Sequence, residues 1–160
     1  MADWFIVNVA EATALQHEQA GSYVRFESPE APFPEIGVNI HIVQPGEPNA
    51  KYHAEEAQED FLVLAGECLV IIDGQERTLR AWDFVHCPAG TEHVFVGAGH
   101  GPCAILMIGA RGGDRGVHYP VNETAARHGA SVTSPTSSPA EAYADWSNEF
   151  THTRLDWPPG

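Results

Sequence analysis

Two segments separated by about forty residues contain the side chains of this chain that are best suited to metal chemistry. The first contains His53 and Glu55, whose i, i+2 spacing places both on one face of a strand, and it continues to Glu59. The second ends at His93, after the turn sequence Pro88-Ala89-Gly90-Thr91-Glu92. Two imidazoles and two carboxylates that meet on one concave surface would form a site for a divalent metal ion. The sequence therefore predicts His53, Glu55, Glu59 and His93 as metal ligands.

The two carboxylates indicate which ions would suit such a site. Ionised Glu55 and Glu59 would cancel the charge of a dication, and carboxylate oxygens favour iron or manganese over copper. Zinc tolerates a mixed shell of nitrogen and oxygen, so the expected divalent ion is Fe, Mn, Zn or Ni. Without a cation the two carboxylates would repel each other, and one would take up a proton at a raised pKa.

Other arrangements of the first segment stay open. Glu55 can turn away, which would leave a triad of two histidines and one carboxylate with three open coordination positions. Glu56 or Gln58 can take its place if the strand bulges. The acidic cluster of Glu55, Glu56, Glu59 and Asp60 is also compatible with a solvated edge, as charge runs usually are.

Length, charge and cysteine content limit the classes of partner. A chain of 160 residues with a formal charge of −14 and one lysine, Lys51, fits a single domain with no nucleic acid or membrane partner. Cys68, Cys87 and Cys103 are expected to be buried thiols, because none lies in a C-x-x-C motif. No signal peptide or membrane span is visible in the sequence, so we expect a cytoplasmic protein.

The residues up to 111 have the pattern of an antiparallel all-β domain, and those from 112 to 160 the pattern of an extended tail. Apolar alternation and turn residues divide the first part into short strands, with Asp73-Gly74 predicted as a type I′ hairpin turn. The expected strands are 4–7, 22–26, 36–43, 61–64, 68–72, 77–80, 84–87, 94–96 and 104–108. Such spacing is typical of a sandwich or barrel. Only residues 10–20 offer a weak helical pattern within this part.

The tail begins at Gly112-Gly113-Asp114 and is rich in Ser, Thr and Pro over residues 131–139. Ser138-Pro139-Ala140-Glu141 has the form of a capping box with proline at the first helical position. We therefore expect a short helix over about 139–150, which docks on the barrel or on a neighbouring subunit.

Both metal-site segments resemble the motifs of the cupin superfamily. His53, then Glu59 and Gly66, match its first motif, and Pro88-x-Gly90-x-x-His93 matches its second. The resemblance spans residues 36–110 and implies a single-domain protein of the conserved-barrel type. It further implies a jelly-roll β-barrel over residues 1–111, with a metal near one mouth and a homodimeric assembly.

Three positions depart from the family pattern. Glu55 stands where the second histidine usually lies, Trp82 replaces the glycine that opens the second motif, and Gly97 replaces its closing asparagine. The changes at Trp82 and Gly97 affect turns and packing, whereas the change at Glu55 alters the predicted ligand set itself.

Three functions are compatible with this sequence. The first is a metal-binding barrel whose open coordination positions take a small molecule, acting, if catalytic, as a dioxygenase-like enzyme. The second is a non-catalytic domain that binds or senses a metabolite through the same metal. The third is a metal-free sugar isomerase or epimerase with His93 as its base. The catalytic residues and the substrate are not indicated.

The remaining histidines have weaker claims to a role. Strand alternation predicts that His86 points away from the barrel interior and that His41 lies on the face opposite Ile40 and Ile42. His118-Tyr119-Pro120 would cover the barrel mouth or tether the tail. Polar surroundings predict no special role for His17, His100, His128 and His152.

Overall fold

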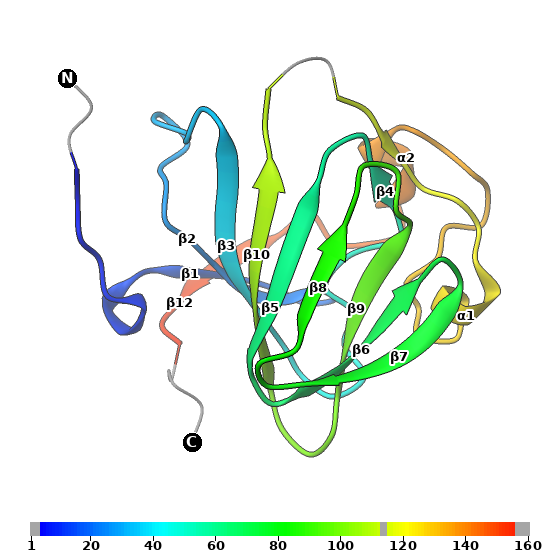
Figure 1. Cartoon of the computed structure of the whole chain (residues 1–160), viewed down its shortest axis with the longest axis horizontal. Coiled ribbons are helices and arrows are strands. Elements are labelled where there is room, and N and C mark those ends of the chain that lie inside the picture. Colours follow the sequence, from blue (N-terminus) through cyan, green and yellow to red (C-terminus); the bar gives the residue numbers. More distant parts are fainter. Residues whose placement is uncertain (1–3, 113–114, 156–160) are drawn as a thin grey trace.

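The computed structural model describes residues 4–112 and 115–155, and antiparallel strands dominate it (Figure 1). The described residues also contain one 3-10 turn, η1, before the first strand and two short α-helices between the last two strands. The elements are η1 Val9–Glu11, β1 Ala14–His17, β2 Gly21–Arg25, β3 Ile36–Val43, β4 Ala54–Glu55, β5 Glu59–Ala65, β6 Glu67–Ile72, β7 Gln75–Arg80, β8 Phe84–Cys87, β9 His93–Ala98, β10 Cys103–Ala110, β11 Val117–His118, α1 Glu123–Ala126, α2 Pro139–Ala142 and β12 Phe150–Thr153. The all-β antiparallel fold predicted from the sequence is confirmed.

The strands form one large sheet and two smaller ones. The seven-stranded sheet has the order β12-β1-β2-β3-β10-β5-β8, the three-stranded sheet has the order β7-β6-β9, and β11 pairs with β4. The inward-facing side chains of the two larger sheets form a shared apolar core. This core includes all three cysteines, which are buried free thiols as predicted. The metal-site residues lie at one end of it.

Backbone geometry explains the predicted turn and two departures from the family pattern. Asp73 and Gly74 both have positive φ, at 45° and 74°, as a type I′ turn requires. Trp82 has φ of 76°, a left-handed conformation that glycine adopts without strain, so this tryptophan occupies a position suited to the family's glycine. At Gly97 a Cβ atom would lie 2.0 Å from the carbonyl oxygen of Gln44, so the approach of this backbone excludes a side chain.

Two predictions for the amino-terminal region are wrong. Residues 4–7 form no strand, and Trp4 and Ile6 are 86% and 89% exposed, because no strand of the described chain pairs with this segment. Residues 14–17 within the weak helical pattern form β1 instead, which pairs with both β2 and β12. Strand pairing over a long sequence separation has overridden local helical preference here.

The tail is more structured than its composition suggests. The helix begins as predicted, with Ser138 as its N-cap, but α2 ends at Ala142 rather than near 150. Residues Phe150–Thr153 form β12, which pairs with β1 at the edge of the large sheet. The tail therefore packs on the barrel and adds a strand to it. Of the predicted linker, Gly113 and Asp114 lie outside the described residues.

Within the described part of the chain, none of the helices has the length and hydrophobicity that a bilayer span requires.

Candidate metal centre

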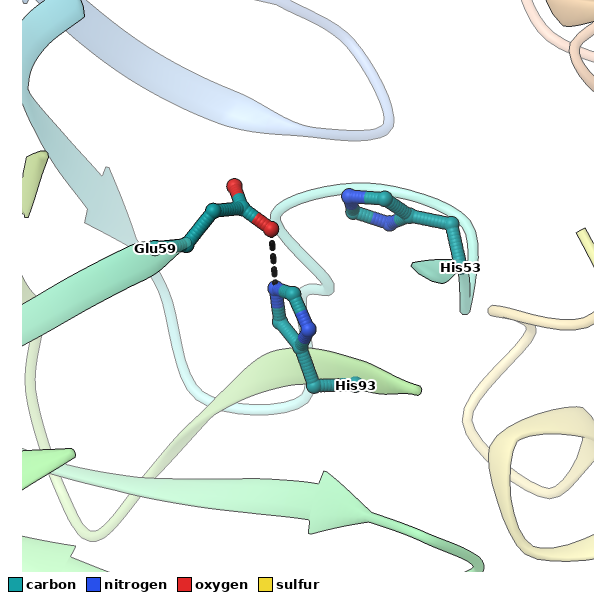
Figure 2. A group of neighbouring side chains, drawn as sticks. All are labelled: His53, Glu59 and His93. Carbon is teal, nitrogen blue, oxygen red and sulfur yellow. Dashed lines mark ion pairs between the residues drawn. The ribbon is translucent and has the colours of Figure 1, made fainter. Parts of the chain in front are cut away.

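Two strands, β5 and β9, and one isolated β-bridge bring His53, Glu59 and His93 together (Figure 2). Glu59 is the first residue of β5, two before the core residue Phe61, and His93 is the first residue of β9, two before the core residue Phe95. Because side chains alternate along a strand, Glu59 and His93 point to the same inner face as these phenylalanines. His53 pairs with His93 in an antiparallel bridge, in which each backbone N–H donates to the other's carbonyl, at N···O distances of 3.1 and 2.8 Å. Directly paired residues share a face, and the two imidazole centroids lie 4.9 Å apart.

The distances suit a single metal ion. One ligand atom from each of His53, Glu59 and His93 lies within 4.8 Å of those of the other two. His93 Nε2 lies 3.4 Å from Glu59 Oε2 (Figure 2). The side chains of His93 and Glu59 are only 3% and 15% exposed. A cation held between these atoms would therefore be largely screened from bulk water.

Backbone carbonyls hold both imidazoles in one tautomer. His53 Nδ1 lies 2.7 Å from the carbonyl oxygen of Lys51, and His93 Nδ1 lies 3.0 Å from that of Thr91. A carbonyl only accepts hydrogen bonds, so each Nδ1 must carry the proton and donate it. The lone pair of each Nε2 remains free to bind a metal, and the ring is already oriented, as outer partners of histidine ligands usually ensure.

Burial keeps the histidines neutral and Glu59 protonated in the metal-free protein. Desolvation lowers the pKa of His93 to about 4, assisted by the neighbouring His53 ring, and it lowers the pKa of His53 as well. Burial, with a smaller contribution from the charge of Glu55, raises the pKa of Glu59 to about 8. Neutral imidazoles are the form that metals bind, whereas the Glu59 proton must leave when a cation enters.

Glu55 is the fourth predicted ligand and follows His53 by two residues. It belongs to β4, and the three-residue group found among the described residues is His53, Glu59 and His93. Its negative charge acts on the pKa values of both Glu59 and His53. The donor set of two imidazole nitrogens and one carboxylate fits a divalent metal, with Glu55 as a charged neighbour.

The rest of the predicted acidic cluster faces outward. Asp60 alternates with Glu59 on β5, and its carboxylate lies 2.6 Å from His86 Nδ1 on β8, an ion pair that lowers the pKa of Asp60. The His86 side chain is 51% exposed, which confirms that it points away from the interior. Glu56 accepts a hydrogen bond from the backbone of Gly116. Of the four acidic residues in the cluster, Glu59 is the one in the three-residue group found among the described residues.

Aromatic rings enclose the metal-site residues. Phe61 lies 5.1 Å from the His93 ring, and Tyr119 lies 5.8 Å from the His53 ring, between ring centroids. Tyr119 is buried, and it also contacts Tyr143 of the tail at 5.7 Å. The segment of His118 and Tyr119 therefore packs against the site through the tyrosine, while His118 is exposed.

A supporting residue that sequence analysis missed is Lys51, which is 1% exposed. Its Nζ lies 2.9 Å from Asp145 Oδ2 and 4.9 Å from the centroid of the Trp146 ring. Its backbone N–H donates to the Tyr143 hydroxyl, at 3.1 Å. Because the Lys51 carbonyl accepts the proton of His53, these tail residues hold the segment that orients a metal-site ring. Single charged and aromatic residues far apart in sequence give no local signal of such contacts.

Two other histidines have roles in packing. His41 lies opposite Ile105 of the core, on the face away from Ile40 and Ile42, as strand alternation predicts. His17 was expected to have no special role, but it is buried at the contact with the tail and its Nε2–H donates to the Ser147 carbonyl.

Comparison with known proteins agrees with the fold. The cupin domain family model matches residues 39–109, which run from β3 to β10. No curated protein sequence matches the chain.

Several solved structures share the fold at low sequence identity. The polyketide cyclase RemF from Streptomyces resistomycificus has 16% identity and a TM-score of 0.59, over 68% of this chain and 80% of that one. A sugar phosphate isomerase of the cupin superfamily from Silicibacter pomeroyi has 19% identity and a TM-score of 0.54, over 95% and 82%. A protein from Acidithiobacillus ferrooxidans assigned as a sugar phosphate isomerase has 24% identity and a TM-score of 0.55, over 62% and 65%.

This chain thus spans slightly less than two thirds of the Acidithiobacillus protein. All three identities are low enough that the likeness concerns the fold alone. The family match over residues 39–109, the antiparallel barrel and the motif positions of His53, Glu59 and His93 together indicate a cupin-type barrel in this part of the chain.

Proposed function

We propose that this barrel binds one divalent metal ion through His53 Nε2, His93 Nε2 and a carboxylate oxygen of Glu59. The observation that carries the proposal is the fixed tautomer of both imidazoles, whose Nδ1–H groups donate to backbone carbonyls beside a buried carboxylate. This arrangement leaves two nitrogen lone pairs and one carboxylate facing a common point. Two imidazoles and one carboxylate suit Fe²⁺, Mn²⁺, Zn²⁺ or Ni²⁺.

The protein residues would prepare this site for a small molecule. A three-residue set leaves coordination positions open, and a bound metal would supply Lewis acidity or, for a redox-active ion, electron transfer to dioxygen. Phe61 and Tyr119 pack against the rings of His93 and His53, respectively. Glu55, whose charge already influences Glu59, would accept a proton from a ligand or add a second carboxylate as the fourth donor.

For the reaction, we propose an oxygen-dependent oxidation of a small molecule at the metal. The experiment is anaerobic loading with Fe²⁺, followed by addition of small-molecule candidates and then of oxygen, with oxygen consumption recorded. A ligand-dependent change in the Fe²⁺ spectrum and oxygen uptake, both lost in His93→Ala, would support the proposal. Ligand-dependent spectral changes without turnover would instead identify a metabolite-binding domain.

A metal-free isomerase or epimerase is the second candidate, because His93 Nε2 is unprotonated and lies 3.4 Å from Glu59. In that function the imidazole would take a proton from a carbon next to a carbonyl group. The similar structures from Silicibacter pomeroyi and Acidithiobacillus ferrooxidans are named as sugar phosphate isomerases. Isomerisation that persists after complete removal of metal would favour this function over the first.

We propose a homodimer as the assembly. The segment from Trp4 to Val7 has strand-forming residues and exposed apolar side chains, and no described strand of its own chain pairs with it. A second copy would supply the missing partner. Light scattering should show a dimer for the natural protein and a monomer for Ile6→Asp, and a monomer in both would contradict the proposal.

A further inference from the structure

A cavity separate from the metal site lies between the C-terminal segment and the strands β1 to β3. Its volume is about 290 Å³, and neither His53, Glu59 nor His93 lines it. The walls contain no Asp, Glu, Lys or Arg side chain. Most of the lining consists of aromatic rings and imidazoles, contributed by His17, Tyr23, His41, Tyr143, Trp146 and Phe150. The lining residues that lie in strands, His17, Tyr23, His41 and Phe150, have no role in the metal site.

Strand register gathers these rings on one face of the large sheet. His17 pairs with Phe150 across β1 and β12, and Tyr23 pairs with His41 across β2 and β3. The rings of these two pairs lie 5.0 and 5.6 Å apart between centroids. Trp146 lies 5.8 Å from His17 and closes the cavity from the tail. The rings thus form the walls of a space suited to a flat, apolar molecule.

His41 contributes a hydrogen-bond acceptor to the lining of the cavity. His41 Nε2–H donates to the Ala20 carbonyl, at 2.7 Å, so its Nδ1 carries a lone pair, and Nδ1 has no hydrogen-bond partner among the described residues. Burial lowers the pKa of His41 to about 4, which keeps the ring neutral. His17 offers no free nitrogen, because Nε2–H donates to Ser147 and Nδ1 accepts from the Gln19 backbone.

Size and charge narrow the class of ligand. An apolar cavity of about 150 Å³ accepts benzene, so about twice that volume accommodates a bicyclic ring or a substituted single ring. The walls hold no cation, and the net charge of the protein is −14, so an anionic ligand would gain no favourable partner. We propose that this cavity binds a small, uncharged aromatic molecule with one N–H or O–H group, which donates to His41 Nδ1.

The test compares three related probes on the metal-free, full-length protein: indole, 1-methylindole and indole-3-carboxylate. Indole can donate to His41, 1-methylindole lacks the donor, and the carboxylate carries a negative charge. Dissociation constants are measured by calorimetry or by chemical-shift titration. We expect indole to bind about threefold to tenfold more tightly than 1-methylindole, as one neutral hydrogen bond implies, and indole-3-carboxylate to bind more weakly still.

Two phenylalanine variants locate the binding. Phe150 lines the cavity and is 50% exposed, whereas Phe84 lies outside it and is 62% exposed, so both can be changed with little risk to the core. We expect Phe150→Ala to weaken indole binding at least threefold and Phe84→Ala to leave it unchanged.

His41→Phe should remove the preference for indole over 1-methylindole. Equal binding of these two probes to the natural protein, an equal loss in both phenylalanine variants, or no binding of indole at millimolar concentration would each overturn the proposal. None of these outcomes depends on the metal site.

Discussion

Metal binding at this site should be coupled to the loss of one proton from Glu59. Burial and the charge of Glu55 raise the pKa of Glu59 to about 8 in the metal-free protein, whereas His93, with a pKa of about 4, is already neutral near pH 6. A cation must therefore displace one proton at any pH below 8. The apparent affinity should fall about tenfold for each unit of pH below that value, or about 100-fold at pH 6.

Calorimetric titration with Mn²⁺ in buffers of different ionisation enthalpy measures this proton directly. We expect release of about one proton at pH 6 and about half a proton at pH 8. Below about pH 5 the dependence should steepen, because His93, with its pKa of about 4, begins to compete as well. In Glu55→Gln the metal affinity should stop increasing at a lower pH than in the natural protein, because this variant removes the second cause of the raised Glu59 pKa.

The same ionisation affects the stability of the metal-free protein. The folded-state pKa of Glu59 lies above its unfolded value of 4.5. The contribution of this group to the free energy of unfolding is therefore lost as the pH rises from about 4.5 to 8. Chemical unfolding should show a decrease of a few kcal/mol over this range that is absent in Glu59→Gln. An affinity for Mn²⁺ that does not change between pH 6 and 8, with no proton released, would refute this reasoning.

Three further substitutions test the supporting structure. Asp145→Asn removes the anionic partner of the buried Lys51. We expect the metal affinity in a Co²⁺ titration to fall about threefold to tenfold, which is less than the loss expected for a residue that directly hydrogen-bonds a metal ligand. Unchanged affinity would show that the tail does not affect the metal site. Trp82→Gly removes the strain of a left-handed backbone conformation at this residue and should raise the free energy of urea unfolding by about 1 kcal/mol. A decrease would show that contacts of the Trp82 indole stabilise the fold by more than the backbone strain destabilises it. Gly97→Ala places a Cβ atom 2.0 Å from the Gln44 carbonyl oxygen and should lower the same quantity by about 2–4 kcal/mol; wild-type stability would contradict the close packing at this point.

Local patterns in the sequence predicted much of the barrel. The strands from 36 to 108 follow from apolar alternation and turn residues, and Asp73-Gly74 adopts the turn that its residue types favour. The candidate ligands His53, Glu59 and His93 came from motif spacing, and the register of β5 and β9 places them on the inner face. These features are local or repeat along one strand, which is why a sequence shows them.

Features that depend on distant pairing were not predictable in this way. β1 and β12 pair across more than 130 positions, and neither segment has a strong strand pattern by itself. Residues 4–7 have such a pattern but no partner strand in the described chain. Lys51 and Asp145 are ordinary charged residues in sequence, and only the packed tail brings them together.

We propose that His53, Glu59 and His93 share a single metal ion. The most direct measurement is an anomalous difference map from crystals grown with Mn²⁺ and recorded near the manganese edge. One strong peak within coordination distance, about 2.0–2.3 Å, of both Nε2 atoms and a Glu59 carboxylate oxygen is the predicted result. A map with no peak at these three residues, or with its peak at the exposed pair of Asp60 and His86, would contradict the claim.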